Sequence, residues 1–375
     1  MLKENVLSIL LQSDGFLSGE SISRDLQVSR AAVNQAVKIL RSEGYVIDSV
    51  TKRGYRLVSG PDRITPGSLQ ALLGEERMAR VLCYESTDST NRRLQEAALD
   101  GSAPNGLIAV ANEQTAGRGR LGRSFSSPQD MGIYLSLLIR PGVFPAANLI
   151  SAQAGVGRSQ TPAANSPASA VSWTILTSWT AVAVSRAIEK VCNIRPEIKW
   201  VNDLLLDGRK ICGILTQMEL ESESGSIRDI IIGIGVNVQE SKKDFPEELQ
   251  DIAGSLFMAT GRKTDRSVLA AEMIRQLDRM CADWYKVYLG EAADSSASSE
   301  MSNPAGRDIA SGYLEEYRRH SLVIGTPVSV INARETKEAI AESIGDDFSL
   351  HVRYSDGSEE DLRGGEISVR KSSST

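Results

Sequence analysis

The first 60 residues carry apolar positions at helical spacing three times, followed by two short apolar runs. Ser18 and Ser29 stand where the caps of a second and a third helix are expected. The apolar positions that define the three helices are Val6, Ile9, Leu10, Ile22, Leu26, Val33, Ala36, Val37 and Leu40. Residues 45–50 and 55–58 predict two strands around a tight turn. Residues 1–60 therefore predict a winged helix-turn-helix domain.

The third predicted helix presents polar side chains opposite its apolar stripe. The outward residues are Arg30, Asn34, Gln35 and Lys38, and the predicted wing tip carries Lys52 and Arg53. Guanidinium and amide groups can read base edges in a major groove, and a basic wing can contact phosphates. A winged helix can also serve protein contacts. The polar face and the basic tip favour DNA binding.

After a turn-rich junction, short apolar runs alternate with helical patterns. The runs predict strands at residues 81–85, 107–111, 133–139, 204–206, 214–220 and 230–238. Helical spacing recurs at residues 91–98, 181–191 and 267–288. We expect residues 61–80 to form a linker and residues 81–320 to form one sheet-centred domain, of the α/β or α+β class.

Residues 321–375 predict a small, barrel-like β module, because several short apolar runs are separated by turns. Its marker residues are Val328, Val330, Ile340, Phe348, Leu350, Val352, Leu362, Ile367 and Val369. Two other segments, 151–180 and 291–310, are rich in small and polar residues and poor in core formers. We expect both to be exposed, mobile insertions.

Composition narrows the class of protein. The chain has 375 residues, 41% of them hydrophobic, and a net charge of −6, which argues against a surface that coats nucleic acid. Its four cysteines lie far apart and it has two histidines, so we expect neither a zinc site nor a histidine-based catalytic triad. A charged start and the lack of a run of about 18 apolar residues predict a cytoplasmic protein.

Residues 114–123 carry the strongest chemical signal in the chain. Glycines and arginines alternate there, directly after an apolar run; they are Gly117, Arg118, Gly119, Arg120, Gly122 and Arg123. Glycines let backbone N–H groups approach an anion closely, and arginines add forked donors for phosphate or carboxylate. Taken alone, the run also suits a solvated basic loop or a nucleic-acid patch.

Four further segments decide between these interpretations. They are Asp-Ser-Thr-Asn at 88–91, Lys-Trp-Val-Asn-Asp-Leu at 199–204, Gly-Arg-Lys-Ile-Cys-Gly-Ile-Leu at 208–215 and Gly-Ile-Gly-Val-Asn at 233–237. With the glycine–arginine loop, they resemble the motifs of the biotin protein ligase family. The winged helix in front resembles that of the bifunctional members, which also repress the biotin operon. Residues 364–370 resemble the end of the family's SH3-like domain.

The resemblance implies an α+β multidomain fold. Its catalytic domain would have a mixed sheet like that of class II aminoacyl-tRNA synthetases, and its C-terminal domain would be an SH3-like β-barrel. The implied activity is an ATP-dependent biotin protein ligase, which forms biotinyl-5′-AMP and passes biotin to a lysine of a biotin carboxyl carrier protein. Mg²⁺ would accompany ATP. The adenylate would also serve as co-repressor, by favouring a homodimer that binds operator DNA.

The same resemblance assigns site residues. Arg118, Arg120 and Lys210 would be catalytic, which suits a reaction that needs charge neutralisation and no side-chain nucleophile. The biotin-binding set is Ser89, Thr90, Asn91, Gln114, Gly117, Arg118, Gly119, Arg120, Lys210, Gly213 and Gly233. The set for ATP and the adenylate is Arg120, Arg123, Phe125, Asn202, Asp203, Lys210 and Asn237. Without the resemblance, Lys210 would be a surface lysine and residues 89–91 a helix cap.

Two other functions compete with the ligase. A transcription regulator could sense biotin without catalysis, but it would not need the phosphate-handling side chains Arg118, Arg120 and Lys210. A lipoate ligase is related, but its glycine-rich signature followed by a His-Asp pair is absent here, and neither His320 nor His351 lies near the loop in sequence.

Overall fold

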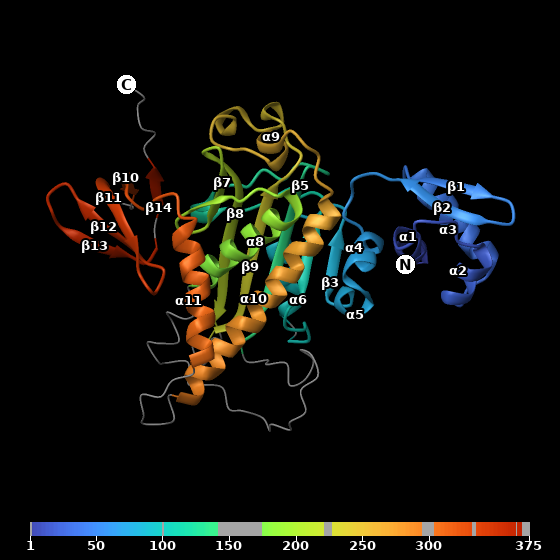
Figure 1. The fold of residues 1–375 in the computed structure, drawn as a ribbon, viewed down its shortest axis with the longest axis horizontal. Helices are drawn as coiled ribbons and strands as arrows, with labels where there is room; N and C mark the ends of the chain where they lie inside the picture. Colours follow the sequence, from blue (N-terminus) through green and yellow to red (C-terminus); the bar gives the residue numbers. More distant parts are fainter. Residues whose placement is uncertain are drawn as a thin grey trace.

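A computed structural model describes residues 2–99, 101–141, 175–220, 227–294, 304–331, 335–364 and 366–369. Three parts follow one another along the chain (Figure 1). We call them the head, which ends at Ser59, the central domain, and the C-terminal sheet, which begins at Thr326. None of the described helices is both long and apolar enough to cross a membrane.

The head is a winged helix-turn-helix domain, as its pattern predicts. It consists of α1 (Leu2–Leu11), α2 (Gly19–Asp25), α3 (Arg30–Ser42), β1 (Val46–Val50) and β2 (Gly54–Ser59). The Ser18 and Ser29 hydroxyls accept hydrogen bonds from the N–H groups of Ser21 and Ala32, at 3.0 Å and 3.2 Å, so both expected caps form. The strands pair antiparallel as the wing.

A seven-stranded mixed sheet forms the middle of the central domain. Its strands lie in the order β3 (Val81–Tyr84), β4 (Ile108–Ala111), β5 (Gly132–Ile139), β9 (Ile227–Asn237), β8 (Arg209–Leu220), β7 (Asp203–Leu206) and β6 (Glu197–Lys199). Only β3 and β4 pair in parallel; the other neighbours are antiparallel. This agrees with the mixed sheet that the resemblance implies.

Helices cover both faces of the sheet. On one face, α6 (Thr90–Ala98) packs Leu94 and Ala98 against Ala109, Leu138 and Ile231 of the sheet. The other face carries α8 (Leu176–Cys192) and α10 (Arg266–Asp294), with α11 (Pro304–Arg319) beside them (Figure 1). The remaining short elements are α4 (Pro66–Leu73), α5 (Glu75–Met78), α9 (Leu256–Thr260) and the 3₁₀ turns Arg120–Gly122, Lys242–Asp244 and Glu247–Leu249.

The C-terminal part is a five-stranded antiparallel sheet. Its strands are β10 (Thr326–Ile331), β11 (Thr336–Ile344), β12 (Leu350–Tyr354), β13 (Glu359–Leu362) and β14 (Glu366–Val369). In the sheet order, β13 and β14 lie at opposite edges, and over the described residues no ladder joins them. The expected small β module is therefore confirmed, while the closed SH3-like barrel is not. Arg370 of the C-terminal signature lies outside the described residues.

The expected insertion at 151–180 is partly a helix instead. Residues 151–174 lie outside the described residues, but Leu176–Thr180 form the first turn and a half of α8. Trp179 there is fully buried and stacks on Tyr313 at a ring distance of 4.1 Å. The Thr180 hydroxyl donates to the Leu176 carbonyl at 2.7 Å, so the hydroxyl of this buried residue keeps a hydrogen-bond partner.

The second expected insertion, at 291–310, is also helical wherever it is described. Its first residues end α10, and its last residues begin α11. Residues 295–303 lie outside the described residues.

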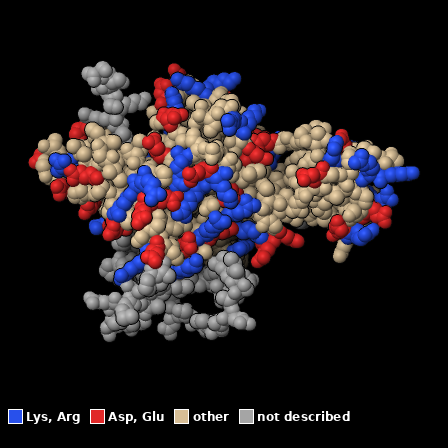
Figure 2. Space-filling model, in the orientation of Figure 1, with Lys and Arg blue, Asp and Glu red and all other residues tan. Residues whose placement is uncertain are grey.

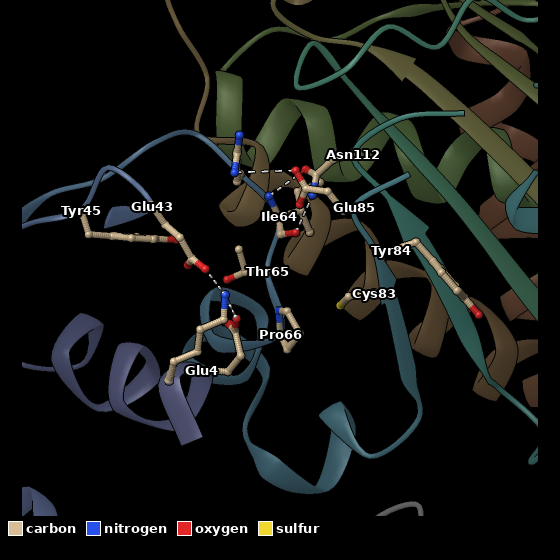
Figure 3. A pocket seen from close by; sticks show the side chains of 12 residues that line it. Glu4, Glu43, Tyr45, Ile64, Thr65, Pro66, Cys83, Tyr84, Glu85 and Asn112 are labelled. Carbon is tan, nitrogen blue, oxygen red and sulfur yellow. Dashed lines mark hydrogen bonds and ion pairs between the residues drawn. The ribbon is translucent and has the colours of Figure 1, made fainter. Parts of the chain in front are cut away.

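Polar contacts join the head to the central domain. The Glu4 carboxylate accepts from the Gly67 N–H at 2.9 Å, at the start of α4. Within the central domain, Asn112, just after β4, anchors the segment that follows the head by bonding to both backbone groups of Ile64 at 3.0 Å and 2.9 Å. A cavity of about 470 Å³ lies between the two parts, and none of the expected site residues lines it (Figure 3).

Candidate active site

The glycine–arginine loop folds back on itself between β4 and β5. The Gly119 N–H donates to the Arg123 carbonyl at 2.7 Å, and the Phe125 N–H donates to the Gly117 carbonyl at 2.9 Å. Gly117 is required by close approach, since a Cβ there would lie 2.6 Å from the Phe125 carbonyl oxygen. The loop is therefore a narrow hairpin rather than an open basic segment.

A short chain of hydrogen bonds joins the loop to the start of α6. The Thr90 N–H donates to Gln114 Oε1 at 2.8 Å, and the Thr90 hydroxyl lies 3.1 Å from the same oxygen. Gln114 Nε2 in turn donates to the Ser127 hydroxyl at 3.1 Å. Two residues of the expected biotin-binding set, far apart in sequence, thus meet directly.

Ser89 stands at the N-cap of α6, but its hydroxyl caps no helical N–H group. The neighbouring Asp88 accepts the Ser89 N–H at 2.7 Å and pairs with Arg93. Burial opposes ionisation of Asp88, but the Ser89 N–H and Arg93 hold the pKa of its carboxyl below the ordinary value. Ser89 therefore occupies the N-cap position, as the helix-cap interpretation expects, without capping the helix through its side chain.

Asn91 is held by two residues that the sequence analysis missed. Its Nδ2 donates to Gln217 Oε1 at 2.6 Å, and its Oδ1 accepts from the Ser136 hydroxyl at 2.6 Å. Gly233 lies against this amide, because a Cβ there would be 2.3 Å from Asn91 Oδ1. Ser136 could have been noticed as a small polar residue inside the otherwise apolar and aromatic run of β5. Gln217 gives no local signal.

A second cluster lies where β7 and β8 pair. Lys210 Nζ lies 2.7 Å from Asp203 Oδ1. Arg120 of the loop donates to Asn202 Oδ1 at 3.0 Å, and Asn202 Nδ2 donates to the Ile214 carbonyl at 2.8 Å. The loop, the 199–204 turn and the start of β8 are therefore in direct contact.

Two glycines keep Phe125 and Lys210 close together. A Cβ at Gly213 would lie 3.1 Å from Lys210 Nζ and 3.5 Å from the Phe125 ring, and a Cβ at Gly235 would lie 2.5 Å from that ring. Phe125 also meets Tyr134 edge to face, with ring centres 6.5 Å apart. The aromatic ring expected at the nucleotide thus lies beside the expected catalytic lysine.

Three other expected residues differ in their exposure. Arg118 and Arg123 have exposed side chains. Asn237 is buried, and its Nδ2 donates to the Gly254 carbonyl at 2.9 Å, so only its Oδ1 would serve a ligand. This amide ties the 252–254 segment to the sheet, a supporting role that the sequence analysis did not foresee.

On the head, the expected DNA-contacting residues of α3 lie on its exposed face, and Lys52 and Arg53 lie at the wing tip. Asn34 Nδ2 donates to the Tyr55 hydroxyl at 3.0 Å, which fixes this side chain against the wing. The Arg53 guanidinium covers the Phe16 ring at 4.4 Å. Figure 2 shows Lys and Arg side chains at the outer end of the head.

One group of side chains could hold a metal ion among the described residues: Glu342, His351 and Glu359. It lies on the C-terminal sheet, away from the sheet that carries Lys210. Arg353 already pairs with Glu342, and Asp361 lies 2.8 Å from His351 Nδ1. The candidate active site thus has no part in this group.

The chain matches known families over its head and over part of its central domain. Residues 83–237 match the biotin/lipoate A/B protein ligase family, and residues 3–56 match an HTH domain. The bifunctional ligase/repressor BirA of Bacillus subtilis is 34% identical over 284 residues, which cover 76% of this chain and 79% of that protein.

The chain belongs to the biotin/lipoate A/B protein ligase family. The Escherichia coli bifunctional ligase/repressor BirA is 28% identical over 373 residues, with 98% of this chain and 99% of that protein covered. The biotin protein ligase from Aquifex aeolicus, solved in complex with biotin and ATP, is 22% identical, with a TM-score of 0.55 over 78% of this chain and 99% of that one. This structure shows the shared fold.

A ligase domain preceded by an HTH domain makes this family member a bifunctional biotin ligase and repressor, and the ligase match favours catalysis over a sensor without it. The family match ends where β9 ends, so it contains both clusters described above.

The buried carboxyl of Glu240 should make the stability of the folded protein depend on pH. It is fully buried just after β9, and burial raises the pKa of its carboxyl from 4.5 to about 7, although two backbone N–H groups and Arg266 oppose this. The folded protein therefore binds more protons than the unfolded chain between these pH values. Its stability falls as the pH rises through that window.

We expect Glu240→Gln to remove this loss, which amounts to about 3 kcal/mol. The measurement is the free energy of unfolding of both proteins at pH 5 and pH 8. The natural protein should lose more stability between the two pH values than the variant does. Parallel pH profiles would contradict the prediction.

Proposed function

We propose that the ligase domain activates biotin with ATP and then transfers it to a lysine of a biotin carboxyl carrier protein. In the first step a biotin carboxylate oxygen attacks the α-phosphorus of ATP, and the bond to pyrophosphate breaks. In the second step the lysine amine attacks the acyl carbon, AMP leaves, and the amine loses a proton. The observation that carries this proposal is the meeting of Arg120 and Asn202 beside the Lys210–Asp203 pair.

Lys210 is the proposed electrostatic stabiliser of the first step. Negative charge grows on the α-phosphate oxygens as the carboxylate attacks, and an ammonium group already held in place stabilises that charge without reorganising. Asp203 holds Lys210 at 2.7 Å. Arg118, Arg120 and Arg123 would neutralise the phosphates, while the N–H groups of Gly117 and Gly119 add donors.

The biotin end of the site is proposed at Ser89, Thr90, Asn91 and Gln114, where hydroxyl and amide groups suit the urea ring of biotin. Gly233 and Gly213 would shape the floor of the biotin site by letting Asn91 and Lys210 lie directly against the sheet. On the nucleotide side, Phe125 would stack on the adenine, and Asn202 and Asn237 would contact the adenylate. The acyl-adenylate reacts with water, so the hairpin loop would act as a lid over it.

Mg²⁺ would accompany ATP at this site and neutralise the departing pyrophosphate. Asp203 is the carboxylate within the nucleotide-binding set that would hold it, and one protein carboxylate plus phosphate oxygens is an ordinary ligand set for this ion. Asp203 Oδ1 pairs with Lys210, which leaves the other oxygen of this carboxylate for Mg²⁺.

For repression, we propose that the adenylate-bound protein forms a homodimer and places two heads on paired operator half-sites. Arg30, Asn34, Gln35 and Lys38 would read base edges, and Lys52 and Arg53 would contact phosphates. The mass of the protein in solution, measured while biotin and ATP are added, tests the dimer. A mass that stays that of the monomer would contradict it.

Release of pyrophosphate from ATP on addition of biotin tests the ligase proposal. Release that depends on lipoate and ignores biotin would favour a lipoate ligase. Tight biotin binding without any release would favour a sensor. Either result would overturn the proposed reaction.

Arg118→Ala should shorten the lifetime of the adenylate on the enzyme more than it weakens the binding of free biotin. The exposed Arg118 side chain belongs to the proposed lid rather than to the biotin-binding floor. We expect the release rate of biotinyl-5′-AMP to rise by about tenfold, the effect of losing one charge-assisted hydrogen bond. The release rate is measured with labelled adenylate, and an unchanged lifetime would refute the assignment.

A further inference from the structure

The amide of Asn91 is fixed at both of its ends. Gln217 Oε1 accepts from Nδ2 at 2.6 Å, and the Ser136 hydroxyl donates to Oδ1 at 2.6 Å. Both Asn91 and Ser136 are buried, and Gly233 of β9 lies directly against the Asn91 amide. With Gln217 Oε1 as its partner, the Asn91 amide nitrogen points toward β8 and its oxygen toward β5. The Ser136 hydroxyl can donate or accept, so Gln217 is the partner whose oxygen favours this orientation.

That orientation sets the direction of the next hydrogen bonds. The Ser136 hydroxyl lies 2.6 Å from Asn91 Oδ1 and 2.7 Å from Thr90 Oγ1, and it has one hydrogen to give. An amide oxygen can only accept, so the Ser136 hydrogen is needed at Asn91. The Thr90 hydroxyl must then use its own hydrogen inside the protein, toward Ser136 or toward Gln114 Oε1 at 3.1 Å.

A hydroxyl whose hydrogen is already used can only accept from a ligand. Thr90 would therefore present a lone pair, which suits an N–H group of the ligand and disfavours a carbonyl or a thioether at the same place. The urea ring of biotin has such N–H groups. Leaving this acceptor unmatched would cost binding energy, which is how a site selects one polar pattern over another.

We propose that Gln217 is a positioning residue for substrate selection. Acting through Asn91 and Ser136, it keeps the Thr90 hydroxyl an acceptor for a ring N–H of the substrate. The inference rests on the proposed function, in which Thr90 and Gln114 hold the urea ring. Gln217 itself touches Asn91 and is not assigned to any contact with substrate.

Two substitutions test whether residue 217 must accept a hydrogen bond from Asn91 or must only contact it. Gln217→Glu keeps an oxygen that can only accept, so the KM for biotin should stay within about twofold of the natural value. Gln217→Met keeps the length of the side chain but has no acceptor of similar strength. It should raise the KM for biotin by about tenfold, with kcat and the KM for ATP nearly unchanged, because one part-buried hydrogen bond is lost.

A second pair of side chains provides the matched control. Gln95 Nε2 donates to Glu219 Oε1 at 3.0 Å, so this pair also ties α6 to β8, one helical turn further along α6 from Asn91. Gln95→Met removes that tie without touching the Asn91 amide. It should leave the KM for biotin unchanged if the role of Gln217 is to orient Asn91 rather than to dock the helix.

Selectivity gives a readout that helix docking would not move. The natural protein should discriminate strongly against biotin methylated at a ring nitrogen, because the methyl group removes the donor. In Gln217→Met the Thr90 hydroxyl is free to turn, so discrimination should shrink by about tenfold. Competition between the two compounds, followed by pyrophosphate release and by calorimetric binding, measures it. The thermal midpoint of each variant checks folding.

The outcomes are distinct. A Gln217→Met variant with the natural KM and the natural selectivity overturns the inference. So does a Gln217→Glu variant as impaired as Gln217→Met, because Gln217 would then act as a donor. If Gln95→Met raises the KM for biotin as much as Gln217→Met does, both side chains only hold α6 against β8, and the inference is overturned. If the natural protein releases no pyrophosphate when biotin is added, the proposed function fails as well. If the natural protein does release pyrophosphate but the Gln217 variants keep its KM and selectivity, only this inference is rejected.

Discussion

Lys210→Ala is expected to lower kcat for biotin-dependent pyrophosphate release by about 100- to 1000-fold, the usual effect of removing one preorganised group from a developing anion. The ammonium group stands 2.7 Å from Asp203, at the start of β8, where Arg120 of the loop also reaches the neighbouring Asn202. Its contribution is made in the transition state, so the KM for biotin should change much less than kcat.

The control for this prediction is another lysine in a similar ion pair. Lys242 lies 3.0 Å from Asp251 and is more exposed than Lys210. Lys242→Ala should leave pyrophosphate release unchanged. If both variants behave alike, Lys210 is the ordinary surface lysine that its sequence context alone would suggest, and the proposed chemistry must be placed elsewhere.

Patterns within a few residues of one another were sufficient to predict the helices and the wing of the head. Apolar spacing and two serine caps define the head, and each cap forms where it is expected. The expected site residues meet because β8 pairs with β7, which places Lys210 near Asp203, and because α6 packs on the sheet, which places Asn91 against Gly233. The motifs identified those residues, while strand register decides which of them touch.

Long-range pairing accounts for what the sequence did not reveal. Gln217 meets Asn91 across 126 positions, and nothing near either residue marks the contact. Trp179 is buried by stacking on Tyr313, which lies far away in the sequence. The small polar residues around Trp179 therefore predict an exposed insertion when the sequence is considered locally. Likewise, closure of a barrel depends on whether β13 meets β14, which the alternation within each strand does not determine.

A buried ion pair at the far end of the sheet predicts the largest loss of stability. Asp229 is fully buried at the start of β9, where it accepts from Arg140 at 3.0 Å and from Arg228 at 2.6 Å. Arg140 also donates to the carbonyls of Gly101 and Ala103, at 2.6 Å and 2.9 Å. These bonds join β5, β9 and the loop before β4 around one charge.

Asp229→Ala is expected to lower the free energy of unfolding by about 3 to 5 kcal/mol, because it leaves the buried Arg140 without its counter-charge. Unfolding by urea, followed by a signal from the central domain, measures the change. Asp251→Ala removes an exposed carboxylate from the Lys242 pair and should cost less than about 1 kcal/mol. Asp229→Asn keeps the shape and part of the hydrogen bonding, so it should fall between the two. Equal costs for Asp229→Ala and Asp251→Ala would mean that the Arg140 pair is solvated and does not hold these strands together.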